Sequence, residues 1–357
     1  MSKLKKQKTG KKILLNLLYI GLTIGVIVVI GFLDPSVTDF FSAIGSLRIG
    51  WVIAAAGACL INFLFEGIAV HNIMRFVHPD FSLGKSIKNG IIGIYYSALT
   101  PFSSGGQPVQ VVYMKKDGVS VGTSTSVFCI KFVIFECVIC LFFVLSLLFR
   151  GVAFFKSNAG VLPLTCIGFA ANALITGVVL LAMVKQGPLL KCCTRIIWFL
   201  NKIHLVKHPE KAVITLSNTL EDYHKSASVF KHDIKMFIST AVIIFIQMFA
   251  YFAVTFFIYK AFGLTGYNLF EIIALQSFLY LTVSFVPLPG ASVASEGGFY
   301  LFFANVFPPE LKFVTMILWR FFTYYANIIF GALFVLSDSI VNVFKASKES
   351  TEQAVQK

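Results

Sequence analysis

The chain has 357 residues, of which 57% are hydrophobic and 13% are charged, and its formal net charge at pH 7 is +14. A soluble domain carries roughly 25% charged residues, so this composition excludes an ordinary soluble enzyme and predicts an all-α polytopic membrane protein. Much of the basic excess lies in residues 1–12 and in the segment 185–235. Nucleic acid is not an expected partner, because no basic folded domain remains once the apolar segments are set aside.

Six apolar segments are long enough to cross a bilayer, which takes about 20 residues of helix. They are Ile13–Phe32, Gly50–Val70, Val121–Phe149, Val161–Val184, Met236–Tyr259 and Leu311–Leu336. The first of them has no small-residue cleavage motif, so we expect a membrane span there and not a signal peptide.

Two further apolar segments end at a proline. Ile87–Thr100 is followed by Pro101, and Leu269–Val286 is followed by Pro287. The first, as a helix, would cover roughly 21 Å, which is less than the hydrocarbon core of about 30 Å. The residue before a proline is also pushed out of helical geometry.

We therefore expect two re-entrant hairpins, one near 87–114 and one near 269–308. The preference of basic loops for the cytoplasmic side supports the first hairpin, because only then do Lys115, Lys116 and the basic segment lie on the same side as residues 1–12. A full crossing by 269–286 is the alternative for the second.

This threading divides the chain into five regions. They are a basic cytoplasmic tail (1–12), a first membrane half (13–184), a cytoplasmic interfacial amphipathic segment (185–235), a second membrane half (236–336) and a cytoplasmic tail (337–357). Broken segments in corresponding places of two halves are typical of inverted-repeat transporters, whose binding site lies near the membrane midplane. The expected location is the cytoplasmic membrane.

The two breaks are rich in glycine and proline, which permit left-handed or closely approaching backbone and end helices. The predicted hinge residues are Pro101, Gly105, Gly106, Pro108, Pro287, Pro289, Gly290, Gly297 and Gly298. A broken helix also directs free N–H groups and its positive dipole end into a cavity, which favours an anion.

Charged side chains inside the membrane are costly, so they are candidates for function. We expect Glu296 and Arg320 to form a bidentate pair, which either pins the hairpin or exchanges with a lipid phosphate. Lys131 either holds an anionic head group or pairs with Glu66 or Glu136. Glu66 itself is expected to reach the interface or to cap its helix.

Hydroxyl and amide groups in the breaks complete the candidate substrate-binding set. That set is Arg320, Glu296, Lys131, Ser103, Gln107 and Ser295. The sequence contains no HExxH, P-loop or GxSxG motif, so we expect no catalytic residue, no metal and no cofactor.

These motifs resemble the lysylphosphatidylglycerol synthase transmembrane region, the flippase-like domain of the multiple peptide resistance factor. The resemblance rests on Pro287-Leu288-Pro289-Gly290, on Ser295-Glu296-Gly297-Gly298, on Arg320 and on Pro101…Gly105-Gly106-x-Pro108, and it covers about residues 10–340. The family's second break reads more like P-x-P-G-G-x-G-x-x-E, so Ala291 and Val293 stand here in place of glycines.

The resemblance implies a lipid flippase that moves a phospholipid, aminoacyl-phospholipid or glycolipid head group across a bacterial cytoplasmic membrane, with a link to antimicrobial peptide resistance. The expected partners are anionic or aminoacylated phospholipids, a separate lipid synthase and a second copy of the chain. Family members that also make the lipid carry a soluble aminoacyltransferase domain, and we expect none in a chain that ends at Lys357. Two alternatives stay open: an enzyme of the phosphatidylglycerol lysyltransferase type or its membrane subunit, and a scaffold for envelope lipid synthesis.

Overall fold

The computed structural model describes Gly25, Phe155 and the ranges 40–151, 159–184, 186–202, 209–230, 233–284 and 286–337. Throughout the described residues the regular structure is helical, and no strand is found there. The predicted all-α membrane architecture is thus confirmed. The predicted span Ile13–Phe32 and both predicted tails lie outside the described residues, apart from Gly25 and Ser337.

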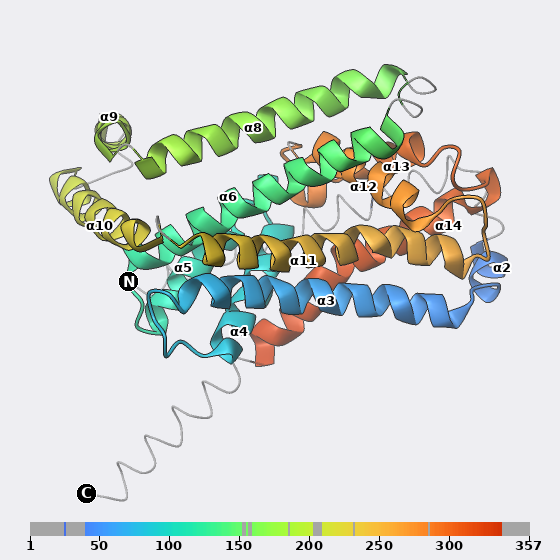
Figure 1. The fold of residues 1–357 in the computed structure, drawn as a ribbon, viewed down its shortest axis with the longest axis horizontal. Helices are drawn as coiled ribbons and strands as arrows, with labels where there is room; N and C mark the ends of the chain where they lie inside the picture. The colour runs from blue at the N-terminus through green and yellow to red at the C-terminus, as the bar shows by residue number, and fades with distance from the viewer. Residues whose placement is uncertain are drawn as a thin grey trace, which may run out of the picture.

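The first half of the bundle runs from the short helix α2 to the long helix α8 (Figure 1). Its elements are α2 (Phe40–Gly45), α3 (Ile49–Met74), α4 (Leu83–Ala98), η2 (Pro101–Ser103), α5 (Gly106–Lys116), α6 (Val121–Ser146), η3 (Leu147–Gly151), η4 (Ala159–Val161) and α8 (Leu162–Val184). Serine hydroxyls begin two of these helices: Ser82 accepts the N–H of Lys85 before α4, and Ser120 accepts the N–H of Thr123 before α6.

Two helices at one end of the bundle, α9 (Gln186–Lys202) and α10 (Pro209–Phe230), precede the second half. The elements of the second half are α11 (Ile234–Ala261), α12 (Leu269–Val283), η5 (Pro289–Ala291), α13 (Ala294–Phe302), α14 (Pro309–Arg320) and η6 (Phe321–Tyr325). A capping box begins α12, because Asn268 and Glu271 each accept the other's backbone N–H. Helical structure continues beyond η6 to Ser337.

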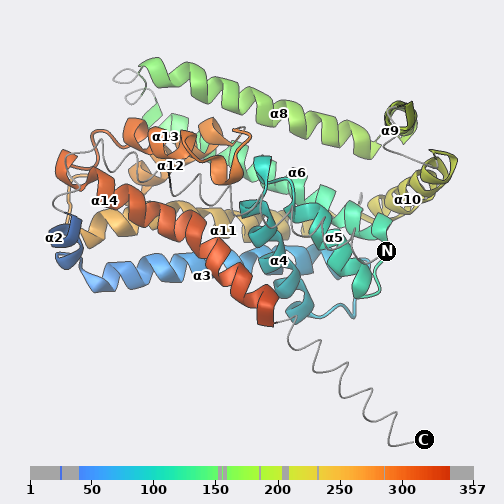
Figure 2. The same ribbon diagram turned by 180° about the vertical axis from the view of Figure 1, so that it is seen from behind.

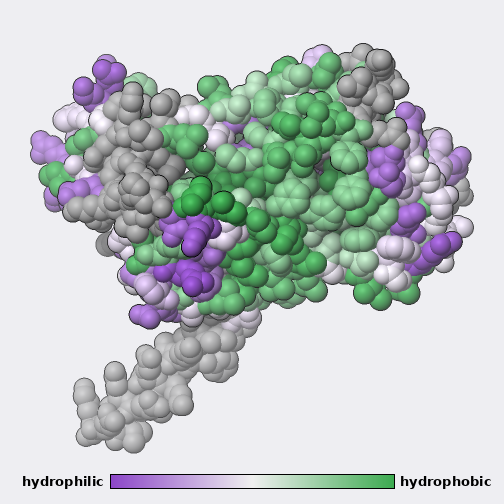
Figure 3. All heavy atoms as spheres, in the orientation of Figure 1, coloured by the Kyte–Doolittle hydropathy of each residue, from purple (hydrophilic) through white to green (hydrophobic). Residues whose placement is uncertain are grey.

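Four of the described helices are long and apolar enough to cross a membrane. They are Ile49–Met74, Val121–Phe149, Ile234–Ala261 and Pro309–Ser337, which agree with four of the predicted spans. The predicted span Val161–Val184 corresponds to α8, whose 23 residues form one continuous helix. In Figure 3 a hydrophobic band covers the middle of the molecule, and hydrophilic residues gather at its two ends, as expected for a bundle with a lipid-facing belt.

Helices α3 and α11 pack side by side along their length (Figures 1 and 2). Aromatic contacts extend this core to α6, since Phe142 stacks on Phe245 with ring centroids 4.6 Å apart and meets Phe252 edge-on at 5.2 Å. Aromatic packing thus joins α6 to α11.

The broken segments form two hairpins that begin at opposite ends of the bundle. Helix α4 returns through η2 into α5, and α12 returns through η5 into α13; the two figures show the first at the end near α10 and the second at the end near α2. Helix α12 has only 15 residues, about 22 Å of helix, which is shorter than the hydrocarbon core of about 30 Å and favours the predicted re-entrant hairpin over a full crossing by 269–286. The tips meet inside, where η2 packs against η5.

Helices α9 and α10 occupy the segment that was predicted to be amphipathic and interfacial. Both lie at the end of the bundle where α5 ends with Lys115 and Lys116 (Figure 1), and α10 packs against α6. Their placement at a membrane surface stays a prediction, as do the five-region boundaries.

Candidate substrate cavity between the two hairpins

The two breaks have the same backbone conformation. Thr100 (φ −122°, ψ 146°) precedes the first and Leu288 (φ −121°, ψ 147°) the second. Each then has a proline followed by a left-handed residue: Phe102 (φ 55°, ψ 18°) in η2 and Gly290 (φ 60°, ψ 19°) in η5. This repetition in opposed hairpins is what an inverted repeat produces.

The serine that follows each break closes it in the same way. Ser104 Oγ donates to the Pro101 carbonyl at 2.8 Å, and Ser292 Oγ donates to the Pro289 carbonyl at 2.8 Å. The backbone N–H of each serine donates to the same carbonyl. Both prolines thus begin a tight turn, and their role as hinge residues stays a prediction.

Left-handed backbone falls mostly on residues other than the predicted glycines. Of the hinge glycines only Gly290 has a positive φ. The other residues of the two breaks with a positive φ are Phe102 (55°), Ser103 (53°), Ala291 (48°) and Val293 (72°). Val293, with ψ −56°, has the geometry of the γ-turn that is rare and strained. Ala291 and Val293 are the two positions at which the sequence departs from the glycines of the family pattern.

At Gly290 the absence of a side chain is required twice. Its φ is left-handed, and a Cβ built there would lie 2.2 Å from the Tyr324 ring. Three other hinge glycines permit close approach: a Cβ would lie 2.5 Å from Thr100 at Gly105, 2.1 Å from Ser97 at Gly106 and 2.4 Å from Leu279 at Gly298.

The remaining hinge residues have weaker structural roles. A Cβ at Gly297 would meet nothing within 4 Å, so the close approach predicted there is wrong. Pro108 lies in the first turn of α5, where a missing N–H costs little. Pro287 lies in a tight turn in which the Leu288 N–H donates to the Val286 carbonyl at 2.8 Å.

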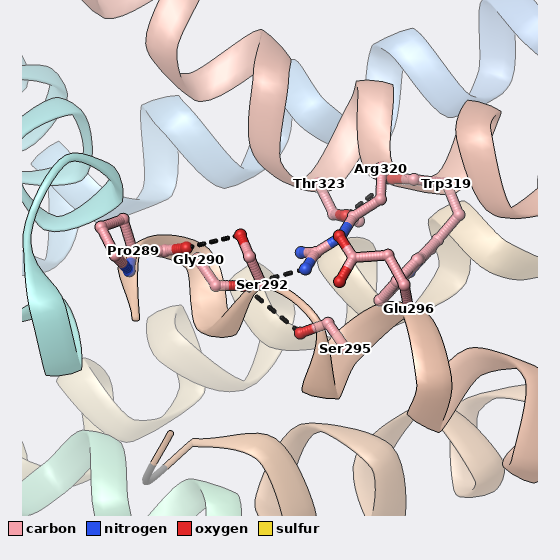
Figure 4. A network of polar contacts seen from close by, with 8 residues as sticks. All are labelled: Pro289, Gly290, Ser292, Ser295, Glu296, Trp319, Arg320 and Thr323. Atoms are coloured by element: carbon pink, nitrogen blue, oxygen red, sulfur yellow. Dashed lines mark hydrogen bonds and ion pairs between the residues drawn. The ribbon is translucent and has the colours of Figure 1, made fainter. Parts of the chain in front are cut away.

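Arg320 joins α14 to the second break (Figure 4). Its Nε donates to Glu296 Oε1 at 2.6 Å, and its Nη2 donates to the Gly290 carbonyl at 3.1 Å. Arg320 and Glu296 are 4% and 1% exposed. The pair therefore forms as predicted, but the predicted bidentate geometry is wrong, because the second guanidinium nitrogen binds the backbone of the break and Glu296 Oε2 has no partner among the described residues.

A second ion pair forms in the first half of the bundle. Lys131 Nζ from α6 bonds to Glu66 Oε1 from α3, and Gln247 Nε2 from α11 donates to Glu66 Oε2 at 3.1 Å. Gln247 Nε2 also donates to Asn62 Oδ1 at 3.2 Å. The expectation that Glu66 reaches the interface or caps its helix is wrong: it is 9% exposed, and it joins three helices in the interior.

The two basic residues occupy corresponding places in the two halves. Lys131 is the eleventh residue of α6, the helix that follows the first hairpin, and Arg320 is the twelfth residue of α14, the helix that follows the second. Each half thus contributes one cation from a similar distance along its own helix, with an offset of one residue; Arg320 is buried and Lys131 is partly buried.

Both cations line a cavity of about 490 Å³ between the hairpins. Of the candidate substrate-binding residues, it also brings together Ser103, Gln107 and Ser295, whereas Glu296 lies behind Arg320 and does not line it. Polar residues that the sequence reasoning left out of the candidate site also line it: Asn62, Glu66, Gln110, Glu136, Asn172, Gln247, Tyr251, Gln276, Tyr280 and Thr323. Asn62, Gln247 and Gln276 are isolated polar residues in apolar spans, a signal that was available in the sequence.

Helices α5 and α13 both begin at the cavity. Gln107 and Ser295, which line it, are each the second residue of their helix. Neither helix has a side-chain cap on its first N–H groups, so those donors and the positive helix ends remain available to an anion.

The fold and the cavity define a multi-pass membrane protein with two opposed broken hairpins around an interior polar site. Residues 16–331 match the family described as lysylphosphatidylglycerol synthase TM region, so the chain belongs to that family. The chain is also similar to a UPF0104 membrane protein of Archaeoglobus fulgidus, with 26% identity over 293 residues, which are 81% of this chain and 87% of the relative.

Proposed function

We propose that this protein translocates a lipid across the cytoplasmic membrane, with the polar head group in the cavity and the acyl chains in the bilayer. The observation that carries the proposal is the cavity of about 490 Å³ at the meeting point of two opposed breaks, lined by one cation from each half. Cavities of about 300–1,000 Å³ are usual for small ligands, and a phospholipid head group falls in that class.

The head group's phosphate has two sets of donors. Arg320 presents a guanidinium whose planar fork matches a phosphate, with Nη1 making no hydrogen bond to the described residues. The uncapped helix ends at Gln107 and Ser295 supply backbone donors near the same cavity. Ser103 adds a hydroxyl from the first break.

The ion pairs have a role in the cycle. Lys131 and Arg320 each pair with an internal carboxylate, because an unpaired charge in the interior would be costly. A phosphate that enters competes with those carboxylates, and Arg320 also holds the Gly290 carbonyl. Loss of that contact on binding would free the second break, which couples substrate to a hinge.

The testing experiment is a dye-bleaching assay in proteoliposomes with head-group-labelled phosphatidylglycerol. We expect wild-type protein to expose inner-leaflet lipid to the bleaching agent, and Arg320→Lys, which keeps the charge but loses the fork, to do so much more slowly. Lys211→Ala, an exposed change on α10, serves as the matched control and should resemble wild type. Equal rates in wild type and Arg320→Lys would remove Arg320 from the path, and no movement with any variant would contradict translocation of this lipid.

The same vesicles distinguish the enzymatic alternative. Lipid extracts after incubation should contain unchanged phosphatidylglycerol. A new head group that appears only with the protein would favour a lipid-modifying enzyme instead.

A further inference from the structure

Glu136 is a buried carboxylate that neither ion pair uses. It lies in α6, is 7% exposed and lines the cavity. Its Oε2 has no hydrogen-bond partner among the described residues. A carboxylate in such a place is costly unless a cation or a proton neutralises it.

The charged groups around the cavity are already engaged. On its own helix Lys131 is held by Glu66 of α3, and across the cavity Arg320 of α14 is held by Glu296 of α13. Those four charges cancel in pairs. Glu136 is therefore the carboxylate without a basic partner in this part of the structure.

The other titratable groups near Glu136 are neutral in their ordinary form. Tyr251 from α11 and Tyr280 from α12 line the same cavity, and Cys137 and Cys140 follow Glu136 on α6. Helix α8 contributes Asn172 and Ile175 to the cavity wall, and neither titrates. None of these groups supplies a positive charge.

We propose that Glu136 is a proton-binding site, and that lipid translocation is coupled to a proton bound and released there. A proton from cavity water binds a carboxylate oxygen of Glu136 on one side of the membrane and returns to water on the other. No other bond forms or breaks. The coupling rests on the proposed function, whereas the proton site does not.

Charge balance gives the physical reason for coupling. With Glu136 ionised, the cavity has a net negative charge that opposes a phosphodiester head group. With Glu136 protonated, the remaining charges cancel, and the head group meets the two cations without that opposition. An anionic head group and a proton therefore favour each other's entry, a reciprocal coupling between two ligands of one cavity.

The proton site is tested without transport, by infrared difference spectroscopy of the purified protein across a pH titration. We expect wild type to show the carbonyl band of a protonated carboxylic acid that disappears as the pH rises, and Glu136→Gln to lack it. Glu310→Gln, at an exposed glutamate in the first turn of α14, is the matched control and should keep the band. Identical spectra for wild type and Glu136→Gln would overturn the proton site.

The coupling is tested in the proteoliposome assay with an imposed pH gradient. Wild type should translocate labelled phosphatidylglycerol several-fold faster with a pH gradient in one direction than without a gradient. The translocation rate of Glu136→Gln should not depend on the gradient. Glu136→Asp, which keeps a carboxylate, should recover part of the dependence on the gradient. That recovery would show that the loss in Glu136→Gln comes from the missing carboxylate and not from misfolding. If the translocation rate of wild type does not depend on the gradient, the coupling is overturned, whereas the proposed function is unaffected.

Two other outcomes are equally decisive. No translocation by wild type would contradict the proposed function and the coupling together, and the infrared titration would still decide the proton site. The second outcome is that Glu136→Gln slows the translocation only of lipids with an amine in the head group, while wild type shows no infrared band of a protonated carboxylic acid. The carboxylate would then bind an ammonium, and the proton site would be overturned.

Discussion

The left-handed valine of the second break gives the sharpest test of the backbone geometry. Val293 has φ 72° and ψ −56° and is 50% exposed. A strained backbone of this kind costs of order 1–3 kcal/mol. Replacement by glycine relieves that strain but makes the unfolded chain more flexible, at a cost of about 0.5–1 kcal/mol. Because little apolar area is lost, Val293→Gly should stabilise the protein by about 1 kcal/mol.

A second valine provides the matched control. Val112 is 54% exposed and lies within helix α5, where glycine is roughly 0.5 kcal/mol worse than valine. Val112→Gly should therefore destabilise the protein, and the two variants should differ by about 1.5 kcal/mol.

The measurement is thermal unfolding of the purified variants in one detergent, at matched protein concentration. A difference of this size moves the midpoint by a few degrees in a chain of this length. Val293→Gly should unfold above wild type and Val112→Gly below it. If Val293→Gly lowers the midpoint as much as the control does, the left-handed conformation assigned to this position is wrong.

Three further predictions concern the ion pairs and the break. Arg320→Met alone should destabilise the protein by about 3–5 kcal/mol because it leaves the buried Glu296 carboxylate unpaired, while Arg320→Met with Glu296→Gln should recover most of the thermal stability without recovering lipid translocation. Lys131→Met should behave in the same way and be rescued in stability by Glu66→Gln; a double variant no more stable than the single would contradict the pairing. Gly290→Ala should lower the unfolding midpoint by more than Val112→Gly does, though by less than Arg320→Met or Lys131→Met, because the alanine Cβ would have a left-handed φ and would clash with the Tyr324 ring. A midpoint equal to that of wild type would refute the left-handed turn.

The hairpins show how far local sequence reaches. Proline at 101 and at 287 is expected to end a helix, and the 14-residue apolar run before Pro101 is too short to cross a bilayer. Those two facts predict both breaks without any knowledge of packing, whereas the 18-residue run before Pro287 left a full crossing open. The shared conformation of the two breaks was not predictable in detail, because Phe102 and Gly290 differ as residues and occupy the same left-handed position.

The fate of Glu66 shows the limit of that reasoning. Its position near one end of a span suggested contact with the interface. The crossing of α3 and α6 instead brings Lys131 to it, 65 residues away in the chain. No periodicity in one helix reports which face another helix will cover.

The sequence by itself determined the membrane class, the long spans, the two breaks and the charged residues that had to find partners in the interior. Those features follow from the cost of exposing polar backbone and charge to lipid, which acts on each segment separately. Only the tertiary structure decided that Arg320 divides its donors between Glu296 and Gly290, that Lys131 pairs with Glu66, and that Glu136 has no basic partner at the same cavity. Pairing between distant helices depends on their register and crossing angles, and these are set when the whole bundle packs.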